Sequence, residues 1–243
     1  MAQNIILIET STALCSVALA ENGQITAYRE SSAPKAHASL TAVFIQEMLE
    51  ERGLTIADCD AVCVSKGPGS YTGLRVGVST AKGLCFGARK PLLAVGTLDT
   101  LVAQALMTEP GPEAQQADYK YIIPMIDARR MEVYAAVFSP CDPEQSKGAY
   151  TQITETAPAI IDENSFAEYL ELGPCLFIGD GAGKCADVIK HPNAHFCQCH
   201  PNAAAMLVPA MDALKEKRFE DVAYFEPFYL KEFVATVSKK KLW

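Results

Sequence analysis

The segment from Ala61 to Ala88, AVCVSKGPGSYTGLRVGVSTAKGLCFGA, constrains the fold of this chain more than any other stretch. Ala61–Ser65 is a short apolar run that ends at Gly67-Pro68-Gly69, a pattern typical of a buried strand followed by a tight loop. Ser70 and Thr72 are candidate N-caps, and apolar side chains then recur at helical spacing. The segment therefore predicts a strand, a loop and a helix in that order.

The predicted helix, residues 72–88, contains four glycines, although each glycine costs a helix interior about 1 kcal/mol relative to alanine. They form two pairs at four-residue spacing, Gly73 with Gly77 and Gly83 with Gly87. Each pair makes a flat face that a neighbouring backbone is able to approach closely. Two interpretations stay open: the glycines let the helix pack on its own sheet, or they face another chain.

Hydrophobic periodicity and turn residues predict the remaining elements. In the first half, strands are predicted at 5–8, 15–20, 24–30 and 92–95, and helices at 36–52 and 98–107. In the second half, strands are predicted at 122–126, 132–138, 149–153, 175–178 and 194–197, and helices at 165–172, 183–189 and 203–218. The halves share one order of elements, which indicates an internal structural duplication.

Residues 109–118, EPGPEAQQAD, are predicted to be a linker, because they hold two prolines, a glycine and no apolar periodicity. We therefore expect a first α/β lobe at 1–108 and a second at 119–220. A C-terminal tail, 221–243, remains and is able to pack back on the first lobe.

Composition favours a globular cytoplasmic protein of 243 residues with no membrane contact. No apolar run approaches the roughly 20 residues that a membrane helix needs, and the opening MAQNIILIET lacks the basic region of a secretory signal. The nine cysteines are expected to be reduced thiols, since Cys15, Cys63 and Cys85 lie in apolar runs. A net charge of −8 suits nucleic-acid binding poorly, because phosphate contacts come mainly from Lys and Arg.

Two segments, IILIETSTALCSVAL and SKGPGSYTGLRVGVSTAKGL, resemble the TsaB family, also called YeaZ, which has a Gcp-like, glycoprotease M22-like domain. Three later segments, MIDARRMEVYAAVF, FIGDGAG and YFEPFYLKEF, resemble it more loosely and in the expected order. The resemblance implies the actin-like, Hsp70-like, sugar-kinase superfold, built from two duplicated RNase H-like α/β lobes.

The resemblance also implies a function in bacterial tRNA threonylcarbamoyladenosine synthesis. The chain would be a non-catalytic scaffold that binds no cofactor, pairs with and activates the catalytic subunit TsaD, and works with the ATPase TsaE. TsaD would transfer threonylcarbamoyl to the adenosine next to the anticodon, so tRNA would reach this chain only through the complex. A homodimer of the isolated chain stays open.

The resemblance places the partner surface on the helices at 36–52 and 72–88, and Gly67-Pro68-Gly69 in a structural loop. The interface residues that this predicts come from both helices: His37, Thr41, Phe44, Gly73, Leu74, Gly77 and Thr80.

Metal-dependent catalysis would need a second histidine one helical turn from His37, and Thr41 stands there instead. A second cluster, HPNAHFCQCH at 191–200, would align His195, Cys197 and Cys199 on one face of a strand. These ligands would span roughly 13 Å, too far to meet at one ion without a turn. We therefore expect no catalytic residue and no metal, with a stand-alone metallopeptidase or small-molecule kinase as the alternative function.

Two segments keep weak nucleotide binding open. The hydroxyl-rich turn Thr10–Thr12 follows Glu9, where many members of the superfold have an Asp that opens a phosphate loop. Gly179–Gly183 precedes Lys184 but does not match a P-loop, which needs a glycine at position 178 and a hydroxyl at position 185.

Overall fold

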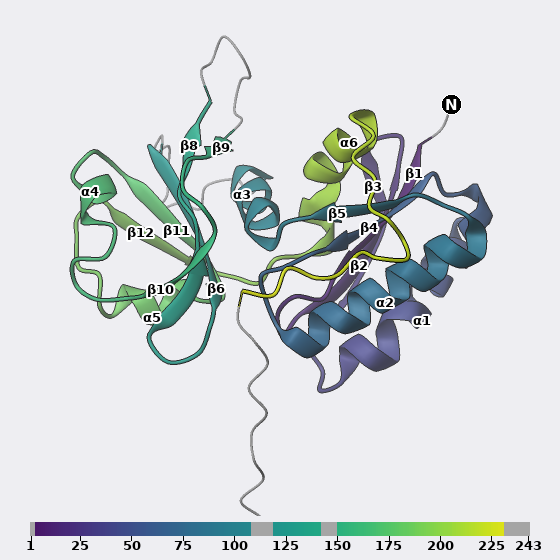
Figure 1. Ribbon diagram of the computed structural model, residues 1–243, viewed down its shortest axis with the longest axis horizontal. Helices are drawn as coiled ribbons and strands as arrows, with labels where there is room; N and C mark the ends of the chain where they lie inside the picture. Colours follow the sequence, from purple (N-terminus) through teal and green to yellow (C-terminus); the bar gives the residue numbers. More distant parts are fainter. Residues whose placement is uncertain (1–2, 108–118, 142–149, 231–243) are drawn as a thin grey trace, which may run out of the picture.

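The computed structural model describes residues 3–107, 119–141 and 150–230, which form two α/β lobes lying side by side (Figure 1). The predicted linker at 109–118 lies outside the described residues. Among the residues described, no helix combines the length and the apolar character that crossing a bilayer requires.

The first lobe is a five-stranded mixed sheet with the order β3-β2-β1-β4-β5. Its strands are β1 (Asn4–Glu9), β2 (Cys15–Glu21), β3 (Gln24–Ser31), β4 (Ala61–Ser65) and β5 (Leu92–Val95). The first three strands are antiparallel neighbours, and β4 and β5 continue from β1 in parallel. The hairpin turn between β2 and β3 uses Asn22 and Gly23 at positive φ, 55° and 77°, as its sequence requires.

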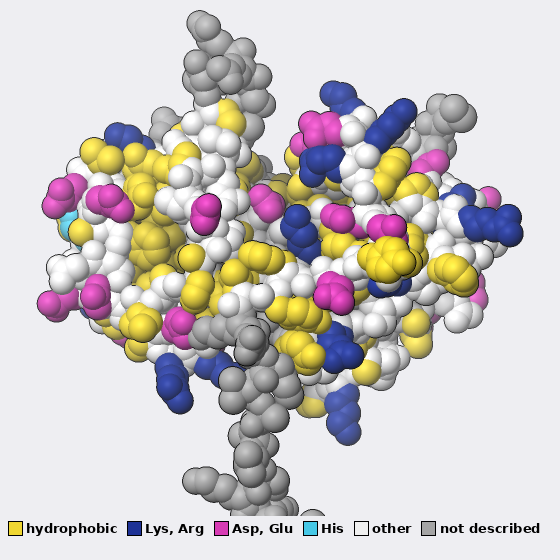
Figure 2. Space-filling model, viewed as in Figure 1, with side chains coloured by type: hydrophobic (Ala, Val, Ile, Leu, Met, Phe, Trp, Pro, Cys, Tyr) yellow, Lys and Arg dark blue, Asp and Glu magenta, His cyan; other side chains and the backbone are white. Residues whose placement is uncertain are grey.

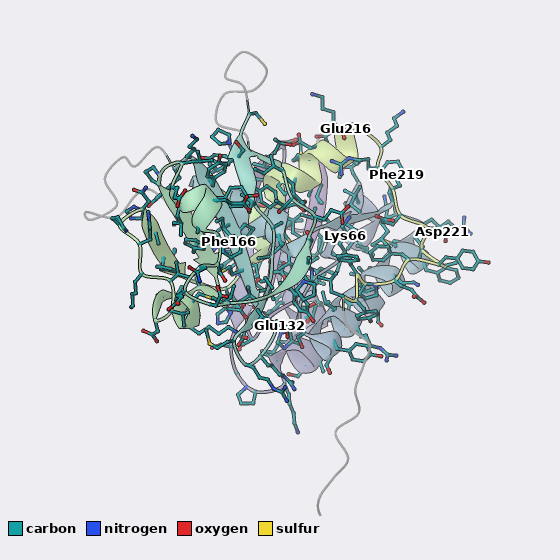
Figure 3. The ribbon with its side chains drawn as sticks, turned by 60° about the vertical axis from the view of Figure 1, so that its left-hand side comes forward. Lys66, Glu132, Phe166, Glu216, Phe219 and Asp221 are labelled. Atoms are coloured by element: carbon teal, nitrogen blue, oxygen red, sulfur yellow. The ribbon has the colours of Figure 1, made fainter. Side chains whose placement is uncertain are left out.

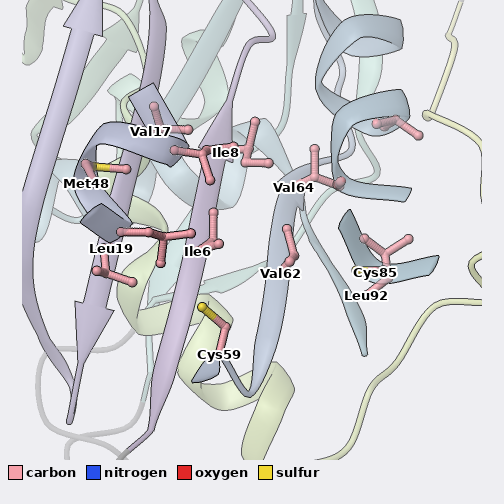
Figure 4. Packing of buried hydrophobic residues seen from close by; sticks show 14 residues of the cluster. Ile6, Ile8, Val17, Leu19, Met48, Cys59, Val62, Val64, Cys85 and Leu92 are labelled. Atoms are coloured by element: carbon pink, nitrogen blue, oxygen red, sulfur yellow. The ribbon is translucent and has the colours of Figure 1, made fainter. Parts of the chain in front are cut away.

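Helices cover both faces of this sheet. α1 (Ala36–Glu51) and α2 (Tyr71–Ala88) lie on one face, above a core that includes Ile6, Val64 and Met48 (Figure 4). The 3-10 helix η2 (Ala203–Met206) and α6 (Leu207–Lys215) pack on the other face. The short 3-10 helix η1 (Ile56–Asp58) leads into β4.

The second lobe repeats the same sheet. Its strand order is β10-β7-β6-β11-β12, and its pairings again run antiparallel, antiparallel, parallel, parallel. The strands are β6 (Tyr121–Asp127), β7 (Glu132–Ala135), β10 (Ala157–Ile160), β11 (Cys175–Gly179) and β12 (Ala194–Gln198), with β8 (Phe138–Pro140) and β9 (Tyr150–Gln152) as an added hairpin beside β6. The predicted duplication is confirmed.

Two short helices cover one face of the second sheet, and a helix from the first half of the chain covers the other face. α4 (Ala167–Leu170) and α5 (Ala182–Ala186) lie on one side, whereas α3 (Thr97–Met107), which comes from the first half of the chain, packs on the other. In return α6 packs on the first sheet. The sequence boundary of the second lobe at residue 220 was therefore wrong, because residues 203–215 bury their apolar side chains in the first lobe.

Other differences from the sequence prediction have local causes. The strand predicted at 132–138 divides into β7 and β8, and β10 was missed because Pro158 marks a position that only an edge strand tolerates. The helix predicted at 165–172 keeps only four residues. The helix predicted at 203–218 starts as η2 and ends before Lys217, whose φ of 55° is left-handed.

Candidate partner-binding surface

The Gly67-Pro68-Gly69 loop, which the resemblance makes a structural loop, joins separate parts of the first lobe. The amide of Ser70 donates to the Ser11 carbonyl at 2.6 Å, and the amide of Thr97 donates to the Gly67 carbonyl at 3.0 Å. A Cβ added at Gly69 would lie 2.3 Å from the Ser11 carbonyl oxygen. The loop therefore has room only for glycine where it meets the β1–β2 turn.

The glycine pair Gly73 and Gly77 faces the interior. A Cβ at Gly73 would lie 2.1 Å from the Thr10 carbonyl oxygen, and a Cβ at Gly77 would lie 2.2 Å from Thr10 Oγ1. Thr10 Oγ1 also donates to the Gly73 carbonyl at 2.9 Å. This pair lets α2 pack on its own lobe, so the expectation that both glycines contact a partner was wrong.

The second pair, Gly83 and Gly87, faces outward. Both glycines are exposed, and a Cβ at either would meet no heavy atom of the described chain within 4 Å. Thr72 and Ser79, which lie along the same face of α2, are also exposed. The outer face of α2 is thus lined by small residues that a second helix is able to approach closely.

On α1, only some of the predicted interface residues reach the surface. Thr41 is 1% exposed, and its hydroxyl donates to the His37 carbonyl at 2.6 Å. His37 is half-buried, with Nε2 at 2.9 Å from the Thr12 carbonyl oxygen, and Phe44 is also half-buried. Val43, which was not predicted, is 43% exposed.

The seven predicted interface residues therefore divide into two groups. Four have no access to a partner because they belong to the core: Thr41, Gly73, Leu74 and Gly77. Three are half-buried and reach the outer surface: His37, Phe44 and Thr80. The sequence could not separate the groups, because Thr10, the residue that fills the space beside the core glycines, is 63 positions from Gly73.

Two aromatic side chains extend this surface. Phe86 on α2 is 83% exposed and Tyr224 is 85% exposed. Lys82, one helical turn before Phe86, donates from Nζ to the carbonyls of Ala223 and Phe225, both at 3.0 Å, which holds the segment around Tyr224 against α2. Figure 2 shows apolar side chains gathered over α2 and this C-terminal segment.

The β1–β2 turn is too enclosed to serve as an open phosphate site. Glu9, Thr10, Ser11 and Thr12 are all at most 5% exposed. Burial raises the pKa of the Glu9 carboxyl above its usual value of 4.5, although the Ser11 amide donates to it at 2.7 Å. Because α2 covers the turn, its geometry favours a structural role.

The corner at Gly179–Gly183 is also held by contacts with other residues of the second lobe. Lys184 Nζ contacts Asp127 Oδ1 at 2.5 Å and the carbonyls of Arg130 and Glu132, both at 2.7 Å. The Asp127 amide donates to Asp180 Oδ1 at 2.9 Å, and burial raises the pKa of the Asp180 carboxyl. This lysine therefore ties the corner to the β6–β7 turn, which Glu132 marks in Figure 3.

Two adjoining cavities, about 310 and 460 Å³, lie where the lobes meet and share Lys66, Gly96 and Asp99 (Figure 3 labels Lys66). Desolvation by the surrounding protein raises the pKa of the Asp99 carboxyl, although its side chain reaches solvent. The described residues of the lining include no cysteine, serine or histidine, so among them there is no thiol or serine nucleophile. Within the described ranges, no three His, Cys, Asp or Glu side chains are arranged to hold a metal ion.

Comparison with known proteins supplies the family. A family model described as "TsaD: tRNA N6-adenosine threonylcarbamoyltransferase" matches residues 29–239. The tRNA threonylcarbamoyladenosine biosynthesis protein TsaB of Escherichia coli K12 is 30% identical over 95% of this chain and 96% of its own length. The chain belongs to the TsaB family. The TsaB protein of Haemophilus influenzae is 31% identical over 99% of the chain and 98% of its own length.

The chain is also similar in structure to a solved YeaZ protein and in part of its sequence to a threonylcarbamoyltransferase. The solved structure of YeaZ from Pseudomonas aeruginosa superposes with a TM-score of 0.78 at 24% identity, over 94% of this chain and 100% of that one. The tRNA N6-adenosine threonylcarbamoyltransferase of Symbiobacterium thermophilum is 41% identical over 33% of this chain and 24% of its own length. The family and the two-lobed superfold that the sequence resemblance implied are confirmed.

Proposed function

We propose that this chain acts in tRNA threonylcarbamoyladenosine biosynthesis as a non-catalytic subunit that pairs with a TsaD-like catalytic subunit. The observation that carries this proposal is the outer face of α1 and α2, where Gly83, Gly87 and Val43 are exposed beside half-buried Phe44 and Thr80. Small residues allow close approach between helices, and exposed apolar groups on a protein surface commonly mark an interaction site. The family names of the full-length relatives support the pathway.

A scaffold role fits the chemistry of the described residues better than catalysis does. Thr41 is turned into the core at the position where a second metal-binding histidine would be needed. Lys184 is bound by three internal acceptors, so it is not available to a phosphate. No observation favours a stand-alone metallopeptidase or kinase. A TsaE-like ATPase would join the pair, tRNA would bind only through the complex, and the isolated chain would pair with itself through the same helices.

The test is a binding measurement with Gly83→Leu. This side chain would point away from the described chain, and leucine favours the helix over glycine by roughly 0.8–1 kcal/mol, so the variant should fold. It should weaken binding to a TsaD-like subunit at least tenfold, which is about 1.4 kcal/mol. Ala167→Leu, on the exposed part of α4, is the matched control and should bind normally. Normal binding by Gly83→Leu would exclude this face as the interface.

A further inference from the structure

The turn between β6 and β7 carries two neighbouring arginines, Arg129 and Arg130, that the partner surface does not include. Both are exposed. Among the described residues, neither guanidinium group has an ion-pair or hydrogen-bond partner. In contrast, Arg29, Arg52 and Arg218 each pair with a glutamate. The turn therefore presents two adjacent positive charges that the described chain leaves without a counter-charge.

Both arginines hold a backbone conformation that side chains other than glycine rarely adopt. The angle φ is 68° at Arg129 and 51° at Arg130. In this left-handed region the Cβ atom crowds the following carbonyl oxygen, and glycine is the usual residue because it has no Cβ. Of the described non-glycine residues with positive φ, these two are the only neighbours in the sequence. Strain of this kind is found mainly at functional sites.

Contacts with the second lobe hold the backbone of this turn in place. The Arg129 amide donates to Asp127 Oδ1 at 2.8 Å, and the Arg129 carbonyl accepts from the Glu132 amide at 3.3 Å. Lys184 Nζ donates to the Arg130 carbonyl at 2.7 Å. Figure 2 shows Lys and Arg side chains projecting below the end of β6. The backbone is thus fixed from the inside while both guanidinium groups stay at the surface.

Two carboxyl groups beside the turn have other partners. Asp127 forms an ion pair with Lys184. The side chain of Asp180 is 15% exposed and accepts from the Asp127 amide at 2.9 Å. The two arginines therefore remain an unneutralised positive site on a chain whose formal net charge is −8. A ligand that meets both of them has to be an anion with at least two negative groups.

We propose that Arg129 and Arg130 bind neighbouring phosphates of an RNA strand in the assembled complex, an inference that rests on the proposed function. A guanidinium group binds phosphate oxygens through two parallel hydrogen bonds. A nucleic-acid strand presents its phosphates in a continuous row, so two adjacent arginines both find a partner on it. Contacts of this kind fix the orientation of the RNA and do not read its sequence.

The equivalent turn of the first lobe is closed to such a ligand. Thr10, Ser11 and Thr12 are at most 5% exposed because α2 covers them. Only the β6–β7 turn of the second lobe is therefore open to a strand of phosphates. Two phosphate contacts alone give weak binding, since the electrostatic part of the affinity grows with the number of contacts. The arginines would thus add to contacts made by the catalytic subunit rather than capture RNA by themselves.

The test is the double variant Arg129→Gly with Arg130→Gly, paired with the TsaD-like subunit and titrated with a tRNA transcript at several salt concentrations. Glycine removes both charges and the backbone strain together, so the thermal unfolding midpoint should stay close to that of the unchanged protein. RNA affinity should fall about tenfold at low salt, and the slope of log K against log salt should shrink by about 1 for each lost contact. Lys217→Gly is the matched control, since Lys217 is also basic, exposed and left-handed, with φ 55°.

Pairing with the TsaD-like subunit is measured first, without RNA, so that the two proposals are judged separately. If the unchanged chain does not pair, the proposed function fails and this inference fails with it. If the double variant pairs normally and its RNA affinity and salt slope match those of the Lys217→Gly control, only this inference is overturned. Weaker pairing by the double variant would also overturn it, because the arginines would then contact protein. If the double variant unfolds at a lower temperature, Arg129→Gln with Arg130→Gln replaces it and the same RNA outcomes decide.

Discussion

In the first lobe α1 and α2 have 16 and 18 residues, whereas the helices at the same positions of the second lobe, α4 and α5, have four and five. The sheets beneath them have the same strand order and the same pairing directions. A duplicated sheet has therefore kept its topology while the covering helices have diverged in length. The long helices of the first lobe supply more outer surface than its own core requires, which is why the partner surface is proposed there.

The ends of the central strands show the same divergence. β1 ends at Glu9, which is fully buried, and the equivalent strand β6 ends at Asp127, whose side chain is 43% exposed and ion-paired with Lys184. In the first lobe α2, through its glycines, covers the end of β1, whereas in the second lobe the end of β6 stays at the surface. Equivalent positions in the two lobes are thus matched pairs for experiments.

The largest expected difference is between helix glycines of the two lobes. Gly73→Ala on α2 should lower the free energy of unfolding by about 3 kcal/mol, because its Cβ would overlap the Thr10 carbonyl, and a backbone atom cannot move aside. Gly183→Ala on α5 should change it by less than about 1 kcal/mol, since its Cβ meets only the end of the Gln198 side chain. Denaturant unfolding measures both, and equal losses would contradict the comparison.

Most of the first lobe could be predicted from the sequence, because its strands and helices are long, periodic and bounded by turn residues such as Asn22 and Gly23. The second lobe was predicted less well, since α4 and α5 are too short to show helical periodicity. The sequence did not predict that α3 covers the second sheet and α6 the first, because the apolar pattern of a helix does not indicate which of two sheets it covers. For the same reason the inward glycines, such as Gly77, could not be told from outward ones such as Gly83.

The second prediction uses the two strand-end carboxyl groups. The raised pKa keeps Glu9 protonated in the folded state at pH values where the unfolded chain has already ionised it. The unfolded state then binds fewer protons, so this group lowers stability as the pH rises above 4.5, by up to about 1.4 kcal/mol per pH unit. Glu9→Gln removes this dependence and should gain stability over the unchanged protein as the pH rises.

The control for that experiment is Asp127→Asn, which breaks a half-exposed ion pair and should cost about 1 kcal/mol or less. Unfolding curves measured from pH 4 to pH 7 separate the two variants. A stability difference between Glu9→Gln and the unchanged protein that stays constant over this range would show that Glu9 ionises normally.

The third prediction compares the lysines of α2 and α5. Lys82→Met should cost about 1 kcal/mol, because it leaves the Ala223 and Phe225 carbonyls without this donor, and it should speed hydrogen exchange in the segment 219–230. Lys184→Met should instead speed exchange at the β6–β7 turn. Each variant serves as the control for the other. If either substitution sped hydrogen exchange at both sites, the prediction that each lysine acts locally would be wrong.

The smallest expected effect is that of a chelator. In the first lobe His37 has a buried threonine as its helical neighbour. In the second lobe His195 and Cys197 lie on β12 and Cys199 follows its last residue, so the three side chains are spread along the chain rather than grouped around one point. Neither arrangement closes the tetrahedral site that zinc requires. The thermal unfolding midpoint should therefore be the same with and without EDTA, and elemental analysis should find far less than one zinc per chain. A stoichiometric zinc that Cys197→Ser removes would place a metal at the second lobe and contradict this prediction.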